Sequence, residues 1–67
     1  MNGTILDVVD GGSIWLLVVN MGNRIVEQPV ELRYMFDIVE GEGLSHPDQL
    51  LGREIAIAAD GMSVAFP

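Results

Sequence analysis

The fold is decided by the stretch from Asp10 to Asn23, which reads DGGSIWLLVVNMGN. Its two ends, Asp10–Ser13 and Asn20–Asn23, are rich in Gly, Asn and Asp, which hairpin turns favour because these residues accept positive φ at low cost. Every residue between them, Ile14–Val19, is apolar, which is typical of a β-strand covered on both faces. The stretch therefore predicts a strand held between two tight turns.

The segments on either side of this strand predict a three-stranded meander. The first strand covers Gly3–Val9, where the apolar residues lose strict alternation, and this predicts a bulge near Asp7. The third strand runs from Arg24 to about Val30. Pro29 restricts it to an edge of the sheet or to a strand end, because proline has no N–H to donate.

The hydrophobic period changes after the third strand. From Glu31 to Glu40 the apolar residues recur at i, i+3, i+4 and i+7, which predicts an amphipathic helix of about three turns. Its apolar stripe consists of Leu32, Met35, Phe36 and Val39. A single helical turn capped by Ser45 and ending at Gly52 follows, and a closing hairpin over 54–66 turns at Asp60-Gly61.

The predicted order of elements is β-β-β-α-β-β in a single domain over residues 1–67. Five short strands with a helix between the third and fourth resemble an OB-type small barrel, in which the helix plugs one open end. An SH3-like barrel is the alternative. We therefore expect a mainly β protein with one helix, built as a small five-stranded β-barrel of the OB-like or SH3-like kind, and this resemblance implies no function by itself.

Composition sets further bounds. The chain has 67 residues, 49% of them apolar, no cysteine, and a formal net charge of −7 from ten Asp and Glu against three Arg. A chain of this size buries only about 60% of its unfolded surface, and no disulfide can add to its stability. The longest apolar run, Ile14–Val19, is too short for a transmembrane helix of about 20 residues. No secretory signal is visible at the N-terminus, so we expect a soluble cytoplasmic protein.

The charge argues against a nucleic-acid partner. Binding to a phosphate backbone draws most of its affinity from Lys and Arg, and the chain has only Arg24, Arg33 and Arg53 among its ten acids. A nucleic-acid-binding barrel stays an alternative if these three arginines gather on one face.

Catalytic and cofactor chemistry finds little support. The only histidine, His46, stands in the run Ser45-His46-Pro47-Asp48, which is typical of a helix start rather than of a catalytic triad. One histidine without cysteine predicts no metal site, and no glycine-rich phosphate loop is present, so no cofactor is expected. A small enzyme or enzyme subunit, with a site completed between chains near His46, stays the second alternative.

The apolar surplus points instead to an interface. Trp15, Leu17 and Val19 share one face of the apolar strand, and Ile14, Leu16 and Val18 share the other. The first three either pack under the helix and the Leu50-Leu51 turn or contact another chain, and we favour the contact because a marginal core gains stability by association. The predicted contact surface is Trp15, Leu17 and Val19, with Met21 or Met62 at its rim. We therefore expect a non-enzymatic protein-interaction or self-assembly module that pairs with its own copies or with a protein partner.

Overall fold

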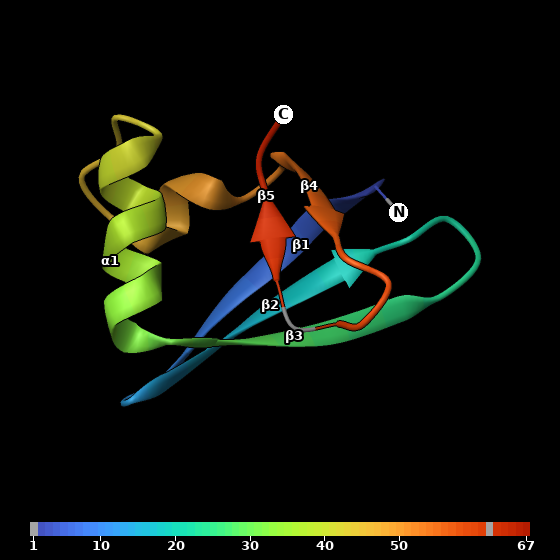
Figure 1. Ribbon diagram of the computed structural model, residues 1–67, viewed down its shortest axis with the longest axis horizontal. Coiled ribbons are helices and arrows are strands. Elements are labelled where there is room, and N and C mark those ends of the chain that lie inside the picture. The colour runs from blue at the N-terminus through green and yellow to red at the C-terminus, as the bar shows by residue number, and fades with distance from the viewer. Residues whose placement is uncertain (1, 62) are drawn as a thin grey trace.

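The computed structural model describes residues 2–61 and 63–67 (Figure 1). The elements follow one another as β1 (Asn2–Gly11), β2 (Ile14–Asn20), β3 (Ile25–Glu31), α1 (Leu32–Gly41), the 3₁₀ helix η1 (Pro47–Leu50), β4 (Glu54–Ile57) and β5 (Val64–Ala65). The expectation of a mainly β protein with one α-helix is confirmed, and the first three strands form the predicted meander.

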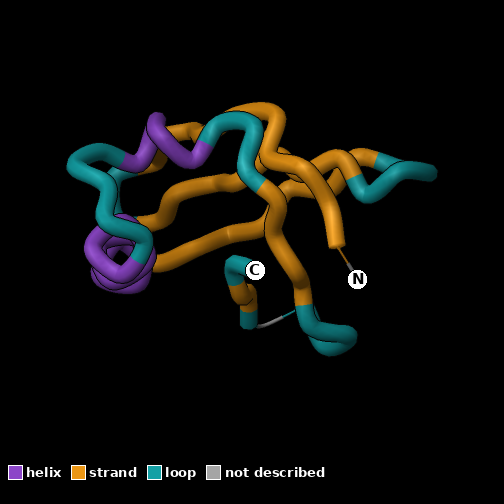
Figure 2. Tube along the Cα trace, turned by 90° about the horizontal axis from the view of Figure 1, so that it is seen from above, coloured by secondary structure: helices purple, strands orange, loops and turns teal. Residues whose placement is uncertain are grey.

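The five strands form one antiparallel sheet in the order β3-β2-β1-β4-β5, which corrects two expectations. The order across the sheet differs from the order along the chain, because β4 pairs with Asn2–Thr4 at the free edge of β1. The predicted barrel is not closed, because β3 and β5 are the two edges and do not pair with each other within the described residues. In Figure 2 the C-terminal strand β5 lies beside β4, with which it pairs.

β1 pairs with β2 on one side and with β4 on the other, and it contains a bulge. The register of β1 against β2 shifts between Ile5 and Asp7, as the sequence predicted, and the Asp7 carboxylate accepts a hydrogen bond from the Val8 N–H at 2.8 Å. Gly3 lies in β1 close to the C-terminal end of β2. A Cβ at this position would lie 2.6 Å from Val19 Cγ1 and 2.7 Å from the Asn20 carbonyl oxygen.

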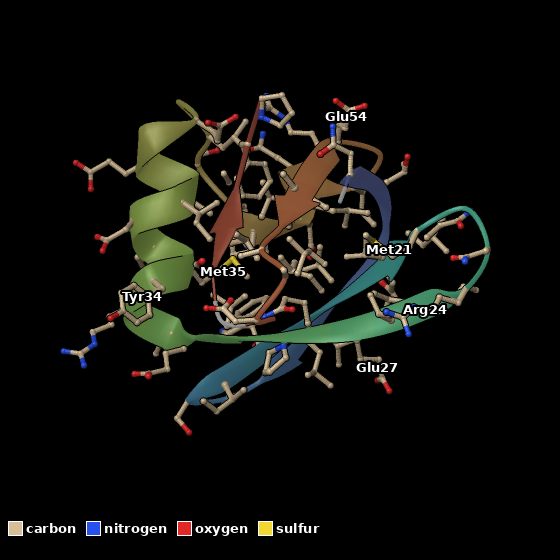
Figure 3. All side chains as sticks on the ribbon, turned by 45° about the vertical axis from the view of Figure 1, so that its right-hand side comes forward. Met21, Arg24, Glu27, Tyr34, Met35 and Glu54 are labelled. Atoms are coloured by element: carbon tan, nitrogen blue, oxygen red, sulfur yellow. The ribbon has the colours of Figure 1, made fainter. Side chains whose placement is uncertain are left out.

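Helix α1 begins directly after β3 and covers one end of the sheet (Figure 1). Its first N–H, from Leu32, donates to the Ser13 carbonyl in the β1–β2 turn at 2.9 Å, which ties the helix start to the sheet. Met35 and Val39 are buried, and Figure 3 shows the Met35 side chain directed toward the sheet. The predicted stripe is corrected at Phe36, which is 57% exposed because α1 turns its other flank, with Ile38 half-buried, toward the core.

The core lies between the inner face of the sheet, α1 and η1. Every element except β5 contributes to the buried apolar side chains, which are Ile5, Trp15, Leu17, Val19, Val30, Met35, Val39, Leu50 and Ile55. This set joins residues from both ends of the chain, so the packing depends on contacts distant in sequence.

Candidate functional site

The predicted contact residues of β2 face inward. Trp15 is 8% exposed, and Leu17 and Val19 are fully buried in the chain's own core. The intramolecular alternative therefore describes these three side chains, which corrects the expectation that they meet a partner. Met21 is half-buried and packs against the same core, whereas Met62 lies outside the described residues.

The opposite face of the sheet carries apolar side chains that are not buried in the core. Neighbouring side chains along a strand alternate between faces, so the burial of Leu17 means that Leu16 points outward. Val9, which pairs with Leu16 across β1 and β2, points to the same side. We define the outer sheet face as Leu6 and Val9 of β1 together with Ile14, Leu16 and Val18 of β2. Leu6 and Ile14 are 47% and 41% exposed, and Leu16 and Val18 are half-buried.

Acidic side chains border this apolar face on both flanking strands. Asp7 of β1 and Glu27 of β3 stand opposite Val18, and Glu31 of β3 stands opposite Ile14. Figure 3 shows Glu27 pointing away from the core. The apolar centre on β2 therefore has acids beside it on both flanking strands, while Ile25 and Pro29 of β3 add apolar surface on the same side.

One sequence signal could have identified the outward face. In β3 the residues Val26 and Val30 alternate with Glu27 and Glu31, so the acids mark the solvent side. If Asn20 pairs with Ile25 across the turn, the register puts Glu27 opposite Val18, as the structure does. The strand β2 is apolar on both sides and could not reveal its own orientation.

A groove, which we call the edge groove, separates the two edge strands of the sheet, β3 and β5. It measures about 610 Å³ and runs between β3, α1 and the segment that leads into β5. Its lining residues are Gln28, Pro29, Val30, Glu31, Tyr34, Asp37, Ile38, Ser63 and Val64. The buried Gln28 lies at this groove, where its Nε2 donates to the carbonyls of Gly61 at 3.0 Å and Pro29 at 3.3 Å. Gln28 therefore connects β3 to the β4–β5 turn without a strand ladder.

The three arginines do not share one surface. Arg24 lies at the β2–β3 turn, at the opposite end of the molecule from Tyr34 in Figure 3. The Arg33 guanidinium lies 5.6 Å from the Tyr34 ring and 3.7 Å from a Glu31 carboxylate oxygen. Arg53 is paired with Glu42 at 2.7 Å. The clustering that a nucleic-acid-binding barrel would need is therefore not observed.

His46 has a structural place at the start of η1. Its Nδ1 accepts a hydrogen bond from the Asp48 N–H at 3.1 Å, and Gln49 Oε1 accepts one from the His46 N–H at 3.1 Å. The capping residue is thus His46 rather than the predicted Ser45, whose own N–H also donates to Gln49 Oε1. The His46 side chain is exposed and lies outside the lining of the groove between β3 and β5.

Among residues 2–61 and 63–67, no three His, Asp or Glu side chains gather closely enough to hold a metal ion. The same part of the chain has no helix with the length and apolar character needed to cross a membrane.

No protein-family model matches the chain, and no curated protein or solved structure matches it at a significant level.

Proposed function

We propose that this chain is a non-enzymatic protein-interaction module that self-associates through its outer sheet face. The observation that carries the proposal is that β2 is apolar on both of its faces. Its inward side chains, such as Leu17, fill the core, while Ile14, Leu16 and Val18 remain on the outside with Leu6 and Val9 beside them. A contiguous exposed apolar patch bordered by polar residues is typical of a protein-contact surface.

The arrangement of charge favours a second copy of the chain as the occupant. On β2, the middle strand of the meander, the outward residues Ile14, Leu16 and Val18 are all apolar, and the acids Glu27 and Glu31 stand on a flanking strand. Two copies related by a two-fold axis would stack β2 on β2, apolar against apolar. The acids would then lie at the rim, where carboxylates keep their contact with water.

The size of the face limits the strength of this contact. Three strands of about seven residues cover roughly 23 Å by 14 Å, or about 320 Å², at the usual strand rise and spacing. A standard stable interface buries about 800 Å² on each partner. We therefore expect a transient dimer that forms at high micromolar concentration rather than an obligate one.

Net charge opposes the same contact and makes it dependent on salt. Each copy carries a formal charge of −7, so two copies repel each other over a distance set by the ionic strength. Raising the salt from 0.1 M to 1 M shortens the screening length from about 10 Å to about 3 Å. Self-association should therefore strengthen as salt is added.

We also propose that the open sheet is a small barrel of the OB-like or SH3-like kind in which closure is incomplete. Closure would require β3 to pair with β5, the two strands that border the edge groove. The hydrogen bond from Gln28 to Gly61 supports this idea, because it joins the two sides of the opening.

Sedimentation equilibrium over a range of protein and salt concentrations tests the proposed function. The double variant Leu16→Thr, Val18→Thr removes apolar surface from the centre of the outer sheet face and keeps residues suited to a strand. The matched control is Phe36→Gln, which removes an exposed apolar side chain from α1. We expect a salt-strengthened dimer for the parent and the control, and a monomer for the double variant. A parent chain that stays monomeric up to about 1 mM, where a contact would be worth less than about 4 kcal/mol, would refute the proposal.

A further inference from the structure

The outer edge of β3 turns part of its backbone toward the edge groove. In the β2–β3 turn the Met21 N–H donates to the Arg24 carbonyl at 2.9 Å. In an antiparallel pair hydrogen-bonded and non-hydrogen-bonded positions alternate, so Val26, Gln28 and Val30 bond to β2. Glu27, Pro29 and Glu31 then face the open edge, where the Pro29 carbonyl accepts a hydrogen bond from Gln28 Nε2 at 3.3 Å and the Glu31 carbonyl belongs to the first turn of α1. The position of Pro29 agrees with this phase, because proline has no N–H to give to β2.

The β5 side of the groove presents a backbone group in the same way. The Ala58 N–H donates to the Ser63 carbonyl at 3.0 Å, so the pair formed by these two residues is hydrogen-bonded. Ile57 and Val64 form the next pair, at which the strands are not hydrogen-bonded to each other. The peptide group of Val64 therefore points away from β4 and toward the groove, which Val64 lines.

The side chains around the groove define the chemistry of an occupant. Glu31 and Asp37 supply two carboxylates, and Ile38 and Val64 supply apolar surface. No Lys or Arg lines the groove in the described chain. Glu31 has the Arg33 side chain at 3.7 Å, but both groups are more than half exposed, and such surface pairs contribute about 1 kcal/mol or less. The groove therefore favours a cationic ligand with apolar side chains.

We infer that the edge groove binds an extended segment of a partner protein in which apolar residues alternate with Lys or Arg. Such a segment would run beside β3 as an added strand and hydrogen-bond to the peptide group of Glu27, the N–H of Glu31 and the peptide group of Val64. Because side chains alternate along a strand, its apolar residues would face Ile38 and Val64 while its cations reach Glu31 and Asp37. The stretch from Glu27 to Glu31 spans about 13 Å, which fits a segment of four or five residues. This site shares only bordering residues of β3, among them Glu27 and Glu31, with the outer sheet face, and it does not depend on self-association.

Synthetic peptides provide the test, with affinity measured by calorimetry on the whole chain. The probe is acetyl-Val-Lys-Val-Lys-Val-amide, and its counterparts replace both lysines by glutamate or the central valine by proline. We expect the lysine peptide alone to bind, more weakly at higher salt, and to shift the backbone NMR resonances of Glu27, Glu31 and Val64. Equal binding of the proline peptide would overturn the added-strand geometry, and equal binding of the glutamate peptide would overturn the role of charge.

Conservative variants separate this site from the rest of the acidic surface. Glu31→Gln and Asp37→Asn should each weaken binding about two- to five-fold, as expected for single exposed charge pairs. Glu40→Gln is the matched control, because Glu40 is exposed on the same helix and does not line the groove. An equal loss for Glu40→Gln would show general charge attraction and overturn the site. The Leu16→Thr, Val18→Thr variant should keep the parent's peptide affinity, so failure of self-association and failure of the groove are observed separately.

Discussion

Two neighbouring leucines on β2 test the assignment of the inner and outer faces. Leu17 is fully buried, whereas Leu16 is half-buried on the outer sheet face. Truncating a core leucine to alanine costs about 2–5 kcal/mol, because the transfer free energy is lost and a cavity remains. We therefore expect Leu17→Ala to lower the free energy of unfolding by about 3 kcal/mol. For Leu16→Ala we expect about 1 kcal/mol, since only part of its side chain leaves water on folding.

The magnitude is large relative to the total stability. A chain of 67 residues is expected to have a free energy of unfolding of about 3–10 kcal/mol. Each kcal/mol shifts the melting temperature by about 4–8 °C in a domain of this size. Leu17→Ala should thus melt at least about 12 °C below the parent. If it does not fold, Leu17→Met provides the comparison, because a volume-conserving exchange in a core costs less than about 1.5 kcal/mol.

Urea unfolding followed by circular dichroism measures both variants, at a dilution where the chain is monomeric. The contrast between the two leucines is the decisive quantity, since they share residue type, strand and secondary-structure propensity. A loss for Leu16→Ala equal to or greater than the loss for Leu17→Ala would refute the assignment of faces. The outer sheet face would then lose its basis as well.

Two further variants test local geometry. Gly3→Ala should cost about 1–3 kcal/mol of unfolding free energy, because the added Cβ would meet the Asn20 carbonyl at 2.7 Å, and that oxygen belongs to the backbone of a paired strand. Thermal unfolding measures the loss, and a Gly3→Ala chain as stable as the parent would contradict the close approach of β1 and β2. His46→Ala should cost about 1 kcal/mol through loss of the acceptor for the Asp48 N–H, whereas His46→Asn should keep most of that stability because asparagine caps helices well. Equal melting temperatures for His46→Ala and His46→Asn would argue against the capping role.

The helix shows where periodicity reaches its limit. At about 100° per residue, Phe36 and Ile38 lie about 80° to either side of the line midway between Met35 and Val39. Both are apolar, and Leu32 lies about 40° from the same line on the Phe36 side, so the helical pattern alone favours burial of the Phe36 flank. The structure buries the Ile38 flank more deeply and exposes Phe36, because α1 follows β3 directly and borders the edge groove on the Ile38 side. The choice between the flanks therefore depends on the neighbouring strand.

Local residue chemistry, by contrast, was sufficient for several features of the sheet. The two hairpin turns around β2, the bulge near Asp7 and the edge position of Pro29 all follow from the sequence, and the structure contains each of them. These features depend on φ preferences, side-chain alternation or a missing N–H, which are properties of a few adjacent residues.

Pairing with β3 decided the orientation of the apolar strand, and tertiary structure alone decided the open edge of the sheet. Ile14–Val19 is apolar on both sides, so nothing within the strand distinguishes its two faces, and the register with β3 selects Trp15, Leu17 and Val19 for the core. The sheet order depends on pairing between Asn2–Thr4 and Glu54–Ala56, which are far apart in the chain. The sequence by itself therefore determined which segments are strands and where they turn. Which face of β2 meets water is decided by its register with β3, and which edges face the groove is decided by contacts between distant segments, because local strand propensity favours neither arrangement.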